Sequence, residues 1–117
     1  MESTTFKIYH NPNCTKSRAT LKLLEERGVK IEIVEYLNSA LEIAEIEDLI
    51  SLLNLPLSKI VRTNEAVFLE QGLDLDDKDM IIKSICKNPI LLERPIVVFG
   101  NKAVIGRPPE NILDLFI

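Results

Sequence analysis

The fold class can be predicted from residues 6–37, FKIYHNPNCTKSRATLKLLEERGVKIEIVEYL. Alternating residues over 6–10 predict a strand, and an Asn-Pro turn signal follows it. Apolar residues at helical spacing predict a helix over about 17–27, and Gly28 fits the position just after its end. A β-branched and aromatic run over 31–37 predicts a second strand. A helix of this length is a suitable crossover, so the stretch predicts a βαβ unit with parallel strands.

The middle of the chain, about 39–92, is predicted to be a helical insertion. Its first helix carries an apolar stripe at i, i+3, i+4 and i+7, formed by Ile46, Leu49, Ile50 and Leu53. Asn64 is suited to cap a short helix over 65–71 that ends near Gly72. A further helix is predicted over 78–87, where apolar residues again share one face.

The last part of the chain returns to strands. The continuously apolar run at 95–99 predicts a strand that is buried on both faces. A Gly-Asn pair separates it from a second run at 102–105, which predicts a tight β-hairpin. The closing residues 107–117 carry two prolines, at 108 and 109, that suit a helix start. The simplest assembly is a thioredoxin-like α/β fold, a four-stranded mixed sheet with helices on its faces, and we expect residues 1–117 to form a single domain.

The composition argues against several classes of protein. A chain of 117 residues with 46% hydrophobic and 27% charged residues is typical of a globular protein. Its net charge of −4 argues against a general nucleic-acid binder. No run of about 18 apolar residues is present, so we expect no membrane span. Two cysteines, together with N-terminal residues that lack a secretory apolar core, favour the cytoplasm.

Cys14 stands in the loop between the first predicted strand and the first predicted helix. The unpaired N–H groups and the dipole at a helix start favour an anion. Lys16 and Arg18 add positive charge, His10 could add more when protonated, and the Ser17 hydroxyl could donate to a thiolate. These features predict a reactive thiol, whereas the alternative interpretation is a cysteine that only fills a loop.

Cys86 has a different setting. It shares a predicted helix face with Ile82 and Ile85, so we expect it in the core, and a role as a resolving thiol is the alternative. The chain has no C-x-x-C motif, because Ser17 stands where the second cysteine would be. One histidine and two cysteines in all argue against a four-ligand zinc site, so we expect no metal.

Three arginines stand at junctions between loops and regular elements, namely Arg62, Arg94 and Arg107. A guanidinium group binds oxyanions through two parallel hydrogen bonds. Each arginine taken singly is also consistent with a solvated surface residue. Their spacing in the sequence does not establish that they converge.

Four segments carry a resemblance to a known family. They are IYHNPNCTKSRATLKLLEERG, IVRTNE, NPILLERPIVV and IGRPPENIL. In this order, and in a chain of this size, they closely resemble the glutaredoxin-coupled arsenate reductase family over nearly the whole chain, from about Lys7 to Leu115. The resemblance implies a thioredoxin-like fold with a helical insertion, which agrees with the elements predicted above.

The resemblance also implies roles for particular residues. Cys14 would be the nucleophile, and the arsenate oxyanion would be held by Arg62, Arg94 and Arg107. The positions that shape and activate the cysteine loop are matched by His10, Asn11 and Ser17. Pro95 matches a proline that precedes a central strand, is usually cis and faces the active site.

Thr15 and Lys16 follow the cysteine where the best-characterised members carry glycine and threonine. The loop therefore resembles that of a sister subgroup with a Cys-Ser/Thr-Lys-Ser-Arg sequence. A related branch consists of regulators that bind RNA polymerase and have no reductase activity, which is an alternative function. Those regulators often carry C-x-x-C in this loop, and Ser17 argues against them here.

The implied function is the reduction of arsenate, or of a related oxyanion, to arsenite by Cys14. Glutathione would be the co-substrate, and glutaredoxin would restore the thiol. A glutathione-linked thiol oxidoreductase with another substrate is a further alternative. The scheme calls for no metal and no organic cofactor, and we expect a cytoplasmic monomer that binds neither nucleic acid nor membrane.

Overall fold

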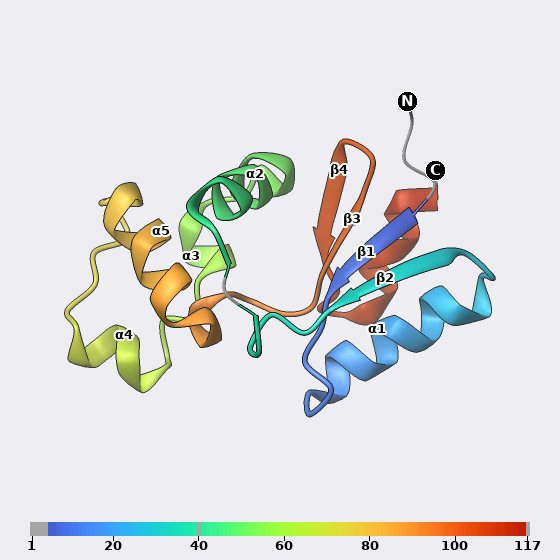
Figure 1. Cartoon of the computed structure of the whole chain (residues 1–117), viewed down its shortest axis with the longest axis horizontal. Helices are drawn as coiled ribbons and strands as arrows, with labels where there is room; N and C mark the ends of the chain where they lie inside the picture. The colour runs from blue at the N-terminus through green and yellow to red at the C-terminus, as the bar shows by residue number, and fades with distance from the viewer. Residues whose placement is uncertain (1–4, 40, 117) are drawn as a thin grey trace. The chain divides into compact units, whose positions relative to one another are not determined.

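The computed structural model describes residues 5–39 and 41–116, and the chain forms two compact units. The sheet unit comprises the residues up to Ser39 and those from Arg94 onward, and the helical unit comprises residues 40–93. Figure 1 shows the elements of both units along the chain. The helical unit has nearly the bounds of the predicted insertion.

The sheet unit contains four strands in the order β2-β1-β3-β4. Its elements are β1 (Thr5–Tyr9), α1 (Thr15–Glu26), β2 (Lys30–Val34), β3 (Ile96–Phe99), β4 (Lys102–Ile105) and the 3₁₀ helix η2 (Pro109–Phe116). Strand β1 pairs in parallel with β2 and antiparallel with β3, which in turn pairs antiparallel with β4. The predicted βαβ unit, the hairpin and the four-stranded mixed sheet are therefore confirmed.

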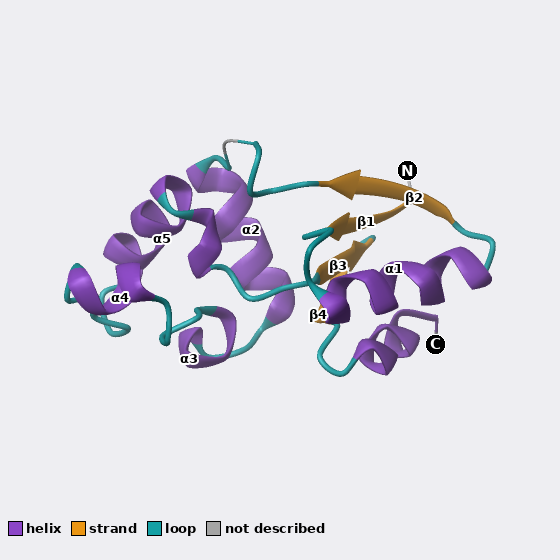
Figure 2. Cartoon of the chain, turned by 90° about the horizontal axis from the view of Figure 1, so that it is seen from below, coloured by secondary structure: helices purple, strands orange, loops and turns teal. Residues whose placement is uncertain are grey.

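The core of the sheet unit lies between one face of the sheet and two helices. Figure 2 shows α1 and η2 on the same side of the strands. The buried residues of this core are Phe6, Ile8, Leu24, Val97, Ile112 and Leu115. Phe6 stacks on Phe99 and Phe116, with ring centroids 4.1 and 4.9 Å apart. Because burial of each large apolar side chain contributes about 1.5–3 kcal/mol, this core fixes α1, and with it the loop that precedes α1.

The helical unit contains α2 (Ile43–Leu53), α3 (Leu57–Ile60), α4 (Ala66–Glu70), α5 (Lys78–Lys87) and the 3₁₀ helix η1 (Pro89–Leu91). The predicted apolar stripe of α2 is buried at all four of its positions. Helix α2 packs against α5, which has the bounds predicted from the sequence. Among the described residues, no helix is both long and apolar enough to cross a membrane.

Several predicted boundaries were wrong. Helix α1 begins at Thr15, earlier than predicted, because the N-cap residue with extended backbone is Cys14. Strand β2 ends at Val34, since the chain turns where the Asn38 N–H donates to the Glu35 carbonyl, 2.9 Å away.

The predicted cap of the short helix was also wrong. Glu65, and not Asn64, is the N-cap residue of α4, and its side chain makes no capping hydrogen bond. The Glu65 carboxylate is instead bonded to Arg62 at 2.9 Å. The predicted end of the helix near Gly72 is confirmed, because Gly72 has a φ of +59°, which glycine adopts readily.

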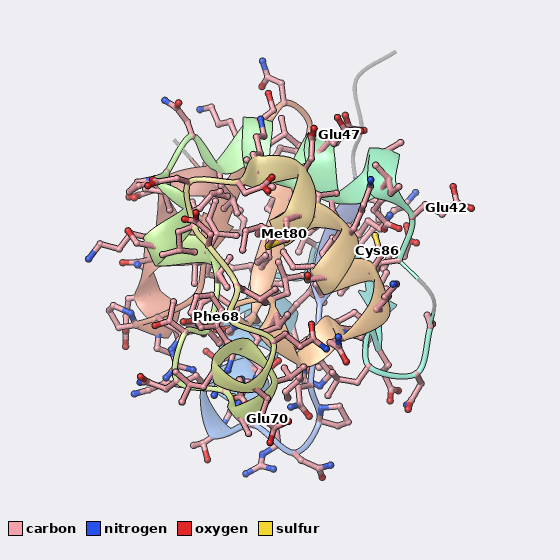
Figure 3. The ribbon with its side chains drawn as sticks, turned by 90° about the vertical axis from the view of Figure 1, so that its left-hand side faces the viewer. Glu42, Glu47, Phe68, Glu70, Met80 and Cys86 are labelled. Carbon is pink, nitrogen blue, oxygen red and sulfur yellow. The ribbon has the colours of Figure 1, made fainter. Side chains whose placement is uncertain are left out.

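Cys86 is partly exposed, so its expected place in the core was wrong. Figure 3 shows its sulfur beside α5. The buried apolar positions of α5 are Ile81, Ile82 and Ile85. Cys86 follows Ile85 directly and therefore lies about 100° further around the helix, at the flank of this face. Burial raises the pKa of the Cys86 thiol, and the charge of Glu45 raises it further.

Candidate active site

Cys14 is the N-cap residue of α1, so its side chain lies at the start of a 12-residue helix. The preceding turn is held by the Cys14 N–H, which donates to the Asn11 carbonyl at 3.0 Å, and by the Asn13 N–H, which donates to Asn11 Oδ1 at 3.0 Å. Arg18 Nη1 donates to the Pro12 carbonyl at 2.9 Å and fixes the turn from the helix side. The Asn-Pro-Asn sequence thus presents a partly exposed thiol at a helix N-terminus.

The pKa of the Cys14 thiol lies below its ordinary value. Burial raises this pKa, but the Ser17 N–H, the charge of Arg94 and the Lys16 N–H together outweigh that effect. A hydrogen bond from the Arg94 side chain lowers this pKa further. Backbone N–H groups at the start of a helix stabilise an ionised sulfur more than a neutral thiol.

Arg94 is the side chain that most lowers the pKa of Cys14. The sequence pointed instead to cations close by in the chain, Lys16 and Arg18. Arg94 was predicted as an oxyanion ligand, and its effect on the pKa of Cys14 is a second possible role of the same guanidinium. This partner comes from a distant segment, and no local pattern around Cys14 reveals it.

His10, Asn11 and Ser17 form a buried hydrogen-bonded group behind the cysteine loop. His10 Nδ1 lies 2.6 Å from Ser17 Oγ, and the Asn11 N–H donates to the same oxygen at 3.0 Å. The hydroxyl of Ser17 is thus bonded within the loop, and it is the backbone N–H of Ser17 that lowers the pKa of Cys14. Donation of the Ser17 hydroxyl proton to the thiolate stays a prediction.

The pKa of His10 lies below its ordinary value of 6.5. Burial lowers its pKa, Glu35 opposes this effect and Arg18 adds to it. A lowered pKa disfavours the protonated form of His10, which is the form that would add positive charge. The observed contribution of His10 is to hold Ser17, and through Ser17 the loop.

Arg94 and Arg107 come together at the ends of β3 and β4. Arg107 Nη1 donates to the Arg94 carbonyl at 3.4 Å. The Gly106 N–H donates to the Pro95 carbonyl at 2.9 Å, which holds the two arginine-bearing segments side by side. The Arg94–Pro95 peptide bond is cis. Two predicted oxyanion ligands and Pro95 thus belong to the same unit as Cys14.

Arg62 belongs to the helical unit, where two carboxylates hold it. Its Nε and Nη2 atoms both lie 2.9 Å from Glu65 Oε2, and its Nη1 lies 3.4 Å from Glu93 Oε1. Its backbone N–H also donates to the Leu91 carbonyl at 2.7 Å. Binding of the oxyanion by Arg62 stays a prediction.

Three further residues that the sequence did not single out hold this region together. Asn111 Nδ2 donates to the carbonyls of Ile105 and Arg107, each at 3.3 Å. The Thr20 hydroxyl of α1 lies 3.4 Å from the Gly106 carbonyl at the end of β4. Long-range contacts of this kind leave no periodic signal in the sequence.

Within residues 5–39 and 41–116, no cluster of three or more His, Cys, Asp or Glu residues is arranged to hold a metal ion.

The geometry joins an acidified thiol to cationic groups. A thiolate is a nucleophile and can be oxidised, and guanidinium groups stabilise an oxyanion beside it. The arrangement is suited to attack by sulfur on the central atom of an oxyanion, or to exchange with an anionic disulfide.

Comparisons with known proteins agree with this arrangement. The ArsC family model matches residues 9–115. An arsenate reductase of Neisseria meningitidis (serogroup A) is 45% identical over 109 residues, which cover 91% of this chain and 93% of the relative. The uncharacterized protein YfgD of Escherichia coli K12 is 44% identical over 114 residues, which cover 93% and 94% of the two chains.

A solved structure of an arsenate reductase from Vibrio cholerae is also similar. It superposes with a TM-score of 0.88 and 36% identity, covering 96% of this chain and 98% of the other. The prediction of a thioredoxin-like α/β fold is confirmed by the sheet and by this neighbour. The family match and the relatives extend over nearly the whole chain, and the chain belongs to the ArsC family.

Proposed function

We propose that this chain is an arsenate reductase in which Cys14 is the nucleophile. The observation that carries the proposal is the partly exposed Cys14 thiol at the start of α1, in the same unit as Arg94 and Arg107. The charge of Arg94 lowers the pKa of this thiol. Membership of the ArsC family, and relatives named arsenate reductase, support arsenate as the substrate.

In the first step, the Cys14 thiolate attacks arsenic(V). A sulfur–arsenic bond forms, an arsenic–oxygen bond breaks, and the oxygen leaves as water after protonation. Arg94 and Arg107 offset the negative charge of the oxyanion and orient it for attack. Arg62 would be a third ligand. The loop held by His10, Asn11 and Ser17, together with Pro95, would keep the sulfur in place.

In the second step, glutathione supplies the other sulfur. Its thiolate attacks the adduct, arsenic(V) takes two electrons and leaves as arsenite, and Cys14 and glutathione become joined by a disulfide bond. A glutaredoxin thiolate then attacks the glutathione sulfur and releases the Cys14 thiolate. One protein cysteine suffices, which fits the raised pKa of Cys86. The scheme uses no metal or organic cofactor, and it suits a monomer in the cytoplasm.

The test is an arsenate reduction assay with two alternative reducing systems. One supplies glutathione and glutaredoxin, and the other supplies thioredoxin with its reductase. We expect turnover with the first system, none in Cys14→Ser, and wild-type turnover in Cys86→Ser. Turnover with thioredoxin alone would show that the reductant is wrong, and activity in Cys14→Ser would show that the nucleophile is wrong. Failure with both systems, with a glutathione adduct still forming on Cys14, would favour a thiol oxidoreductase with another substrate.

A further inference from the structure

Three segments of the sheet unit meet at Gly106, which directly follows β4. A Cβ atom added to Gly106 would lie 2.5 Å from Thr20 Oγ1 and 2.9 Å from Pro95 Cγ. It would also lie 3.0 Å from Thr20 Cγ2. These distances are shorter than van der Waals contact, so position 106 accepts only glycine unless its neighbours move apart. We call this the Thr20–Pro95–Gly106 contact.

Hydrogen bonds reinforce this contact. The Gly106 N–H donates to the Pro95 carbonyl at 2.9 Å. Thr20 is fully buried, and its hydroxyl lies 2.8 Å from the Lys16 carbonyl and 3.4 Å from the Gly106 carbonyl. The single hydroxyl proton is therefore shared between the first turn of α1 and the loop beside Arg107.

Each member of the contact is tied to a group that the proposed chemistry uses. Pro95 directly follows Arg94, and Gly106 directly precedes Arg107. Thr20 is bonded to the first turn of α1, the turn that Cys14 caps. A shift of the contact therefore moves the arginines relative to the sulfur.

We propose that the Thr20–Pro95–Gly106 contact sets the position of Arg94 and Arg107 against Cys14, with Thr20 and Gly106 as positioning residues. The inference rests on the proposed function, in which these three groups handle the oxyanion. The close approach at Gly106 keeps the three segments in register, and the Thr20 hydroxyl links the helix to the loop. Errors of about 1 Å in such an arrangement reduce rates by up to about 100-fold.

The test measures the rate of Cys14 alkylation by iodoacetamide against pH, in a Cys86→Ser background so that one thiol reacts. In Gly106→Ala, the added methyl separates Thr20 from Pro95 and draws Arg94 away from the sulfur. We expect the pKa of Cys14 to rise, so that the rate at pH 7 falls about 3- to 10-fold. Thr20→Val keeps the shape of the side chain and removes the hydroxyl. We expect it to raise the pKa of Cys14 by less than Gly106→Ala does. Thr20→Ser keeps the hydroxyl and restores most of the wild-type profile.

Gly100→Ala is the matched control. Gly100 has a φ of +61° in the β3–β4 turn, and a Cβ added there meets nothing within 4 Å. This variant costs stability without touching the contact, so its melting temperature falls while the profile of Cys14 stays unchanged. A purely structural role for Gly106 predicts the same behaviour in Gly106→Ala.

Arsenate kinetics supply the second readout. We expect Gly106→Ala and Thr20→Val to raise KM for arsenate at least as much as they lower kcat. Folded Gly106→Ala and Thr20→Val proteins with wild-type profiles and wild-type KM would overturn the inference. If Gly106→Ala does not fold, identical profiles in Thr20→Val and the wild type overturn it. If the wild type reduces no arsenate, the proposed function fails, and the alkylation profiles still decide the positioning claim.

Discussion

Removal of the Arg94 guanidinium is the most informative single change to the candidate active site. Arg94 lowers the pKa of Cys14 by its charge and by a hydrogen bond, whereas burial raises that pKa. In Arg94→Ala, only the N–H groups of Ser17 and Lys16 remain among the named groups that oppose burial. The pKa of Cys14 therefore rises, and the thiolate fraction at neutral pH falls.

The size of the effect follows from the interaction that is lost. A hydrogen bond to a charged group contributes about 1.5–3 kcal/mol. Arg94 and Cys14 are both partly exposed, and solvent screening reduces the value to about 1–2 kcal/mol. At a pH below the pKa of the thiol, this corresponds to about 5- to 30-fold less thiolate, because 1.36 kcal/mol is a factor of ten.

The assay is the rate of iodoacetamide alkylation of Cys14 between pH 4 and 10, with peptide mapping to separate it from Cys86. Arg94→Lys keeps the charge without the planar fork, so its profile should lie between those of the wild type and Arg94→Ala. Lys22→Ala removes an exposed cation from α1 and should leave the profile unchanged. Arg94→Ala and wild-type profiles that coincide, with circular dichroism showing an intact fold, would refute this account of the thiol.

Further predictions concern the other groups of the sheet unit and the second cysteine. Arg107→Ala should lower kcat/KM for arsenate about 5-fold and leave the pH profile of Cys14 alkylation unchanged. Arg107 is exposed, so the charge-assisted bonds that it would make to the oxyanion are weakened to about 1 kcal/mol. Equal kinetics in Arg107→Ala and the wild type would show that Arg107 does not bind the oxyanion. Because the pKa of His10 is lowered in the folded protein, the unfolded chain protonates this histidine first as the pH falls below 6.5, and the folded state loses stability in that range. The fall in melting temperature between pH 7 and pH 5 should therefore be smaller in His10→Gln than in the wild type. Mild oxidation of the isolated protein should give no intramolecular disulfide, because the thiol of Cys86 has a raised pKa; a Cys14–Cys86 bridge in high yield, detected by mass spectrometry, would instead support a thioredoxin-coupled mechanism or a regulator.

Local patterns in the sequence were sufficient to predict most of the fold. The bounds of α5 and the buried stripe of α2 follow from helical spacing of apolar residues, which is a short-range property. The βαβ unit follows from the run that surrounds Cys14. The predicted cap of α4 was wrong because capping preferences do not take into account the ion pair that Glu65 forms with Arg62.

The candidate site was predictable in its members and less so in their roles. The position of Cys14 at a helix start could be inferred from the Asn-Pro turn and the helix behind it. Among the side chains, Arg94 lowers the pKa of Cys14 most, and not the cations next to Cys14 in the chain. The sequence does not reveal this pairing, because it depends on the order of the strands in the sheet. The contact at Gly106 was missed for a similar reason, since a missing side chain gives no signal until its neighbours are known.

The central claim is that Cys14 and one glutathione together reduce one arsenate. The most direct measurement is a single turnover with arsenate and glutathione but without glutaredoxin, stopped at intervals and analysed by mass spectrometry and by arsenite assay. We expect one arsenite per protein, together with one adduct of about 305 Da on Cys14 and none on Cys86. An adduct that forms equally fast without arsenate, or arsenite that accumulates without an adduct on Cys14, would contradict it.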